Sequence, residues 1–280
     1  DRVVVVVSPD MSDVTGALGN ADIAVQEQAL GTGHAAQCAM ASLEGFDGTI
    51  LILFGADPLI STTTLERLIA ARRGADAPPL VVLGFRPTDS AQYGRLVVND
   101  AGQLERIVEY WDADEATRAI NLCNSGAVAA DATTLATLLA CLGNDNAKGE
   151  YYLTDIVGLA RQDGAQCKVV EGDPDELVGI DTREDLARAE AGFQAEARRA
   201  ALAGGATLID PETVWFSFDT EIGQDVIVEP NVFLGPGVKI GDGVSIKAFS
   251  HLEGCVVRDG ATVGPFARLR PGADIGAQAK

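Results

Sequence analysis

Glycines and polar side chains gather near the amino end of the chain. Residues 26–35 read QEQALGTGHA and follow a short apolar run at 23–25. Glycine lets a backbone approach a ligand closely, and the free amides at the start of a helix favour an anion or the edge of a base. The Gln26 side chain both donates and accepts hydrogen bonds, which suits a pyrimidine. This stretch indicates a nucleotide-binding turn, although an ordinary strand-to-helix turn would have the same pattern.

An acidic residue follows a second apolar run. Residues 51–60 read LILFGADPLI, so Asp57 lies at the tip of a predicted buried strand. A carboxylate in that position can hold a divalent cation that bridges phosphates. The alternative is an aspartate that caps or forms the turn beside Pro58.

Three short segments farther along the chain combine glycine with neutral and acidic polar groups. They read YGR, IVE and NSG, and they contain Gly94, Glu109 and Asn124. Such groups bind hydroxyl-rich ligands such as sugars, although each residue by itself could equally belong to a turn or a cap. A fourth segment, 149–155, reads GEYYLTD and adds a hydroxyl and an acid to two tyrosines, whose packing could also explain it.

The elements that must position these residues alternate between strand and helix up to about residue 180. Compact apolar runs predict strands, and stretches with helical spacing predict helices. The strands are expected at 3–7, 49–54 and 80–84, and the helices at 32–43 and 62–73. This alternation predicts an α/β fold with a mostly parallel sheet covered on both faces, whose ligands bind beyond the carboxyl ends of the strands.

A single long helix is predicted at 182–203. Thr182 can cap its start with Asp185 three residues on, and Gly204 with Gly205 suits its end. A helix of that length spans roughly 33 Å, enough for a strut between two domains. A solvated surface helix is the alternative.

A six-residue period runs through the rest of the chain. The period places aliphatic residues at Ile222, Val228, Leu234, Ile240, Ile246 and Leu252 and, after one shortened interval, at Val257, Val263, Leu269 and Ile275. Neither a helix nor an alternating strand has this period, which is typical of a parallel β-helix. Short antiparallel strands joined by Gly/Pro turns would be the alternative.

Charge and composition exclude several classes of function. The formal net charge of −20 repels nucleic acid and anionic membranes, and no apolar run is long enough for membrane insertion. The five cysteines are scattered and lack CxxC spacing, which indicates reduced cysteines in a cytoplasmic protein.

Taken together, these motifs resemble a known enzyme family. QEQALGTGHA, YGR, IVEYWDA, CNSG, NDNAKGEYYLTD and GPFARLRPGA occur in this order before and within the hexapeptide repeats. The chain resembles, over essentially all its length, the bacterial bifunctional N-acetylglucosamine-1-phosphate uridyltransferase/glucosamine-1-phosphate acetyltransferase. The resemblance implies a Rossmann-like nucleotidyltransferase domain at 1–181, a linker helix at 182–204, and from 205 to 280 the start of a left-handed β-helix that forms homotrimers.

The resemblance also implies roles for particular residues. The nucleotide of UTP would contact Gln26, Gly31, Thr32, Phe54 and Gly55. The N-acetylglucosamine group would contact Gly94, Glu109, Asn124 and Thr154. Mg²⁺ would be held by Asp57 and Asp181. The implied reaction joins UTP and N-acetylglucosamine-1-phosphate to give UDP-N-acetylglucosamine, a precursor of cell wall and lipopolysaccharide, and pyrophosphate. It needs no protein nucleophile, so catalysis would rest on positioning and charge neutralisation.

The chain departs from the family pattern in three respects. The glycine-rich phosphate loop and Pro-Lys element of the family would lie before Asp1. Ala56 occupies the position of the family's metal-binding acid, and Asp57 is displaced by one residue. Asp181 stands where the family has an asparagine, and aspartate still provides an oxygen ligand.

The acetyltransferase half of the family extends beyond the repeats present here. Arg268 and Arg270 could contact its substrate or could be structural arginines on a coil edge, so we do not predict acetyl transfer. Two alternatives remain: a non-catalytic fragment that binds sugar nucleotides or trimerises, and a nucleotidyltransferase for another sugar-1-phosphate.

Overall fold

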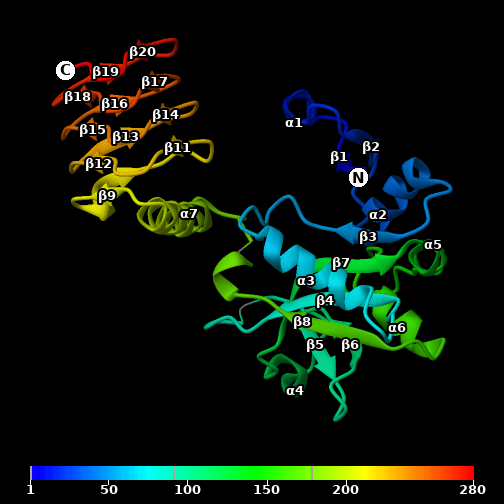
Figure 1. Cartoon of the computed structure of the whole chain (residues 1–280). Helices are drawn as coiled ribbons and strands as arrows, with labels where there is room; N and C mark the ends of the chain where they lie inside the picture. The colour runs from blue at the N-terminus through cyan, green and yellow to red at the C-terminus, as the bar shows by residue number, and fades with distance from the viewer. Residues whose placement is uncertain (1, 91, 178) are drawn as a thin grey trace. The chain divides into compact units, whose positions relative to one another are not determined.

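The computed structural model describes residues 2–90, 92–177 and 179–280. The chain forms two compact units, Asp1–Gly179 and Ile180–Lys280 (Figure 1). The functional division at 181 and 204 stays a prediction.

A six-stranded sheet forms the centre of the first unit. In spatial order its strands are β3 (Thr49–Ile52), β7 (Cys123–Asp131), β4 (Leu80–Phe85), β8 (Cys167–Glu171), β6 (Leu104–Val108) and β5 (Arg95–Val98). β7 runs antiparallel to β3, β4 and β5, while β4 and β8 are parallel. β6 is antiparallel to β5 and β8. Four of the six strands (β3, β4, β5 and β8) therefore point the same way, and β7 separates β3 from β4.

Helices cover both faces of this sheet, because its strands bury side chains on both sides. Leu80 and Val82 of β4 join one apolar cluster, and Val81, Leu83 and Phe85 join the other. Alternate residues of a strand point to opposite faces, so one strand contributes to both cores. The helices that contribute are α2 (Thr32–Met40), α5 (Ala132–Ala140) and α6 (Asp155–Gln162) to the first cluster and α3 (Thr62–Arg72) to the second. The predicted α/β fold is confirmed.

The remaining elements of the first unit are small. β1 (Val4–Val7) and β2 (Asp22–Val25) form a two-stranded parallel sheet. The others are α1 (Ser12–Ala17), α4 (Glu115–Arg118) and the 3₁₀ turns Ala41–Leu43 and Pro174–Glu176. The predicted strands and helices of this unit are present, within a few residues of the expected ends.

The second unit begins with the predicted long helix, α7 (Arg183–Ala203). Thr182 and Asp185 form the expected capping box, and Gly205 has a φ of +98° just beyond the helix end. The helix is not a free surface element. Gln194 Nε2 donates to Phe216 O at 2.7 Å, and Arg198 Nε donates to Val214 O at 3.0 Å, which fastens α7 to the first coil of the repeat region.

The repeats form a parallel β-helix whose coils appear as stacked rungs (Figure 1). Three four-stranded parallel sheets make its sides. The first side consists of β9 (Thr207–Leu208), β12 (Ile227–Val228), β15 (Ser245–Ile246) and β18 (Thr262–Val263). The second consists of β10 (Val214–Trp215), which follows the 3₁₀ turn Pro211–Thr213, β13 (Val232–Leu234), β16 (His251–Leu252) and β19 (Arg268–Leu269). The third consists of β11 (Glu221–Ile222), β14 (Lys239–Ile240), β17 (Val256–Val257) and β20 (Asp274–Ile275).

The six-residue period corresponds to these sides. The aliphatic residues of the period pack together along the inside of the coil. Where the period shortens, the structure turns through Gly254, with a φ of +52°, and buries Cys255 before Val257. The predicted β-helix is confirmed. None of the helices in the described parts of the chain is long and apolar enough to cross a membrane.

Removal of one inward side chain should destabilise the β-helix much more than removal of an outward one. Ile246 is fully buried, whereas Ile227 on the same side is 44% exposed. We expect Ile246→Ala to lower the free energy of unfolding by about 3 kcal/mol and the matched Ile227→Ala by less than about 1 kcal/mol. Urea unfolding in a Trp111→Phe background, followed by Trp215 fluorescence, measures both. Equal losses would contradict the assignment of inward and outward positions.

Candidate functional site

Three strand ends meet on the first unit, and each carries one of the residues expected to contact a sugar. Arg95, the first residue of β5, pairs with Val108 of β6 and with Cys123 of β7. Gly94 directly precedes Arg95, Glu109 follows Val108, and Asn124 follows Cys123. Since antiparallel partners lie directly opposite each other, this register brings Gly94, Glu109 and Asn124 together.

Contacts among the three residues are close. Asn124 N donates to Gly94 O at 2.8 Å, and the Asn124 Oδ1 accepts from Gly126 N at 3.1 Å. A Cβ added to Gly94 would lie 3.4 Å from Glu109 Oε2 and 3.6 Å from Asn124 Cβ. A side chain at this position would therefore occupy the space between the Glu109 carboxylate and Asn124 Cβ, which glycine leaves open.

Thr154 completes this group, which we call the polar cluster (Gly94, Glu109, Asn124 and Thr154). Its Oγ1 donates to Glu109 Oε1 at 3.1 Å. Burial raises the pKa of Glu109, while the Thr154 hydrogen bond and Lys148 lower it and two nearby aspartates raise it, with a net upward shift. The cluster thus offers a partly desolvated carboxyl group that is hydrogen-bonded to a hydroxyl.

The residues expected to contact the nucleotide lie along the segment that leads to Thr154. Gly31 has a φ of +106°, and a Cβ there would lie 2.6 Å from Tyr151 O. The hydroxyl of Thr32 accepts from Leu153 N at 3.1 Å. Gln26 Nε2 donates to Gly31 O at 3.1 Å and lies 2.9 Å from His34 Nδ1. The predicted nucleotide and sugar residues are therefore joined through residues 151–154.

Phe54 and Gly55 follow β3 and approach the same strand end. Gly126 has a φ of +90°, and a Cβ there would overlap the Phe54 ring. Gly126 also donates to Asn124, so the ring lies next to the polar cluster. Apart from its neighbours in the chain, no atom of the described residues lies within 4 Å of where a Cβ on Gly55 would be, and Gly55 is exposed.

The two acids expected to hold a metal fall in different units. Asp57 N donates to Phe54 O at 3.3 Å, and its Oδ1 lies 3.3 Å from where a Cβ on Gly179 would be. Asp181 belongs to the second unit, where its N–H donates to Asp185 Oδ2 at 3.3 Å. Their pairing stays a prediction. Within residues 2–90, 92–177 and 179–280, no group of three or more His, Cys, Asp or Glu residues could hold a metal ion.

Arg268 and Arg270 lie in the second unit. Arg268 is on β19, paired with His251, and Arg270 follows the strand at a coil corner. Both side chains are exposed. Their contact with an acetyltransferase substrate stays a prediction.

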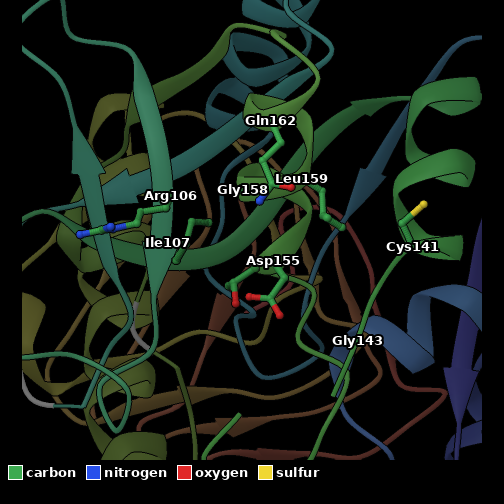
Figure 2. A pocket seen from close by; sticks show the side chains of 9 residues that line it. Arg106, Ile107, Cys141, Gly143, Asp155, Gly158, Leu159 and Gln162 are labelled. Carbon is green, nitrogen blue, oxygen red and sulfur yellow. The ribbon is translucent and has the colours of Figure 1, made fainter. Parts of the chain in front are cut away.

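A hollow beside the polar cluster was not predicted from the sequence. It has a volume of about 330 Å³ and is bounded by β6, α6 and the chain after α5 (Figure 2). Thr154 lines it together with Ile107 and Asp155. The GEYYLTD segment pointed to Thr154 and Asp155, which line the hollow, but the packing of α6 against β6 could not be derived from that segment.

Comparisons with known proteins bear on the family of the chain. A family model described as bacterial transferase hexapeptide (six repeats) matches residues 219–254. The bifunctional protein GlmU of Paramagnetospirillum magneticum is 55% identical over 99% of this chain and 61% of its own length. GlmU of Sphingopyxis alaskensis is 51% identical over 99% of the chain and 61% of its length, and GlmU of Zymomonas mobilis is 45% identical over 100% and 63%. The resemblance to the bifunctional family is confirmed. The chain spans about three fifths of the length of these GlmU relatives.

The raised pKa of Glu109 predicts a pH-dependent effect of replacing its carboxyl group. When the pKa of a carboxyl group is higher in the folded than in the unfolded protein, the folded protein loses stability as the pH rises from the unfolded pKa through the folded pKa. Glu109→Gln cannot titrate and keeps an acceptor for Thr154. The variant should therefore gain stability relative to the wild type between about pH 4 and about pH 7. Urea unfolding at both pH values, followed by Trp111 in a Trp215→Phe background, measures the difference.

The matched control is Glu105→Gln, on the exposed part of the same strand. Its effect on stability should change little between the two pH values. If Glu109→Gln shows no larger pH dependence than this control, burial does not raise the pKa of Glu109.

Proposed function

We propose that the first unit binds UTP and N-acetylglucosamine-1-phosphate and transfers the uridyl group to form UDP-N-acetylglucosamine and pyrophosphate. The observation that carries the proposal is the polar cluster, in which Glu109 Oε2 and Asn124 Cβ border the space left open by Gly94 and the Thr154 hydroxyl donates to Glu109 Oε1. Similarity to the GlmU proteins over nearly the whole chain supports it.

The polar cluster has the chemistry required for an acetamido sugar. Glu109 can accept from an amide N–H or a sugar hydroxyl, and Asn124 can both donate and accept. The partial burial of Glu109 strengthens such bonds, because less water competes for the carboxyl oxygens. The position of Gly94 allows a sugar ring to approach the backbone closely.

The nucleotide would lie along the adjoining turn. Gln26 can bind a pyrimidine edge, and the amides at the start of α2 suit a negatively charged group. In the proposed reaction, a phosphate oxygen of the sugar-1-phosphate attacks the α-phosphorus of UTP, and pyrophosphate leaves. The residues of this chain hold the two substrates in line, and no covalent enzyme intermediate forms.

Mg²⁺ is part of the proposal as a cation that neutralises phosphate charge. Mg²⁺ usually takes only one or two protein carboxylates and completes its shell with phosphates and water. The protein ligands in the proposal are Asp57 and Asp181, as the family resemblance implies. Asp57 is the weaker of the two, since it stands one position from the family's acid.

Assembly and location are also proposals. A homotrimer through the β-helix is supported by the exposed rings of Phe218, Phe249 and Phe266, which are 84%, 56% and 75% accessible in the single chain. A cytoplasmic location is supported by the five free cysteines. A non-catalytic sugar-nucleotide-binding fragment and a nucleotidyltransferase for another sugar remain the competing functions.

A pyrophosphate-release assay on the protein that carries this sequence tests the function. With UTP and Mg²⁺, turnover should be at least about tenfold faster with N-acetylglucosamine-1-phosphate than with glucose-1-phosphate, because only the acetamido group can use Glu109 fully. Preference for glucose-1-phosphate or for another nucleotide would favour a different nucleotidyltransferase. Absence of turnover by the folded protein would favour the non-catalytic alternative.

The same assay tests the metal assignment. Asp57→Asn should raise the Mg²⁺ concentration needed for half-maximal rate by about tenfold, because a neutral amide is a weaker ligand than a carboxylate. Asp76→Asn, an exposed aspartate paired with Lys168, is the control and should leave that concentration unchanged. An unchanged Mg²⁺ requirement in Asp57→Asn would show that Asp57 is not a ligand.

A further inference from the structure

Arg95 is buried in the first unit, next to Gly94 of the polar cluster. Only 2% of the residue is exposed. Burying a guanidinium group is costly unless its N–H groups are bonded, so its partners show which parts of the chain it holds.

The guanidinium group of Arg95 binds backbone carbonyls of two separate segments. Nε donates to Arg118 O at 3.2 Å, and Nη1 donates to Ser90 O at 3.2 Å and to Tyr93 O. Ser90 and Tyr93 belong to the loop that leads into Gly94, and Arg118 ends α4. A planar guanidinium group holds such acceptors in a fixed geometry that an ammonium group cannot reproduce.

The guanidinium group of Arg95 also lies near Tyr110, the residue after Glu109. The Cζ of Arg95 lies 5.9 Å from the ring centroid of Tyr110, and the Cζ of Arg118 lies 4.6 Å from it. Arg118 Nε donates to Tyr110 O at 3.1 Å. Tyr110 directly follows Glu109, so the two arginines restrain the chain at the carboxylate.

We propose that Arg95 is a positioning residue for the sugar pocket. Through Tyr93 its guanidinium group fixes the loop of Gly94, and through Arg118 and Tyr110 it fixes the segment of Glu109. It thereby sets the spacing between the open position at Gly94 and the carboxylate that receives the sugar. The identity of the sugar in this inference rests on the proposed function.

Arg95→Lys tests the proposal, because lysine keeps the charge and loses the planar set of donors. The KM for N-acetylglucosamine-1-phosphate and the calorimetric Kd for UDP-N-acetylglucosamine should both rise about tenfold, since misplacement of a binding group weakens every contact it makes. The KM for UTP should stay within about twofold, because the carbonyls that Arg95 binds belong to the Gly94 loop and α4 and not to the nucleotide turn at 26–35. A general structural defect would weaken both substrates alike.

Arg86→Lys is the matched control. Arg86 lies in the same unit and binds Glu171 through an exposed pair of hydrogen bonds. Its replacement should leave the KM for both substrates unchanged.

A second variant keeps the test decisive if Arg95→Lys does not fold. Arg118→Ala removes an exposed side chain and its bond to Tyr110 but keeps the carbonyl that Arg95 binds. It should raise the same KM and Kd by about threefold, because one restraint on the Glu109 segment is lost.

Unchanged sugar affinity in a folded Arg95→Lys protein would overturn the positioning role, as would unchanged affinity in Arg118→Ala if Arg95→Lys does not fold. A wild-type protein that binds UDP-N-acetylglucosamine without turnover would contradict the proposed function, and the Kd comparison would still decide the role of Arg95.

Discussion

The pairing of one residue, Arg95, with strands on two sides is the constraint on which the candidate site depends. Its backbone is opposite Val108 on β6 and opposite Cys123 on β7, so the next residues along all three strands converge. A slip of one residue in either pairing would turn Glu109 or Asn124 to the other face of the sheet. Bringing these residues together also costs stability, because Glu109 becomes partly buried, and this burial raises the pKa of its carboxyl group.

Stability of the second unit depends on a different constraint, the stacking of identical positions from coil to coil. Ion pairs such as Lys239–Glu221 and Arg258–Asp274 connect neighbouring coils, but their side chains are about half exposed or more. Exposed pairs of this kind contribute little, so the buried aliphatic column must supply most of the stabilisation. The buried aliphatic column is also kept across the shortened interval between Leu252 and Val257. The residue that is missing there comes from the corner between two strands, so Val257 still stacks on Ile240.

The parts of the fold that could be predicted are those set by neighbours in sequence. The aliphatic period predicts the β-helix because each coil repeats the same local geometry, and Thr182 with Asp185 marks the start of α7 because a capping box is a local motif. β7 was not predicted, because its run of small residues gives no clear strand pattern and its place between β3 and β4 is set by long-range pairing.

The candidate site shows the same limit. The individual residues Gly94, Glu109 and Asn124 could be named from the sequence, and their roles remain predictions. Their contact with one another and with Thr154 comes from strand register, which no single segment encodes. Arg95 was part of the YGR motif but received no role, because backbone carbonyls such as those it binds leave no mark in the sequence. The direction of the Asp57 side chain, toward Gly179, likewise depends on tertiary packing.

A crystal structure of the protein with UDP-N-acetylglucosamine and Mg²⁺ tests the account most directly. We predict that the acetamido N–H of the sugar lies within hydrogen-bond distance of a Glu109 carboxyl oxygen, with the ring over Gly94 and the amide of Asn124 at its edge. A nucleotide sugar bound elsewhere on the first unit, with the polar cluster unchanged and in contact only with water, would contradict the account.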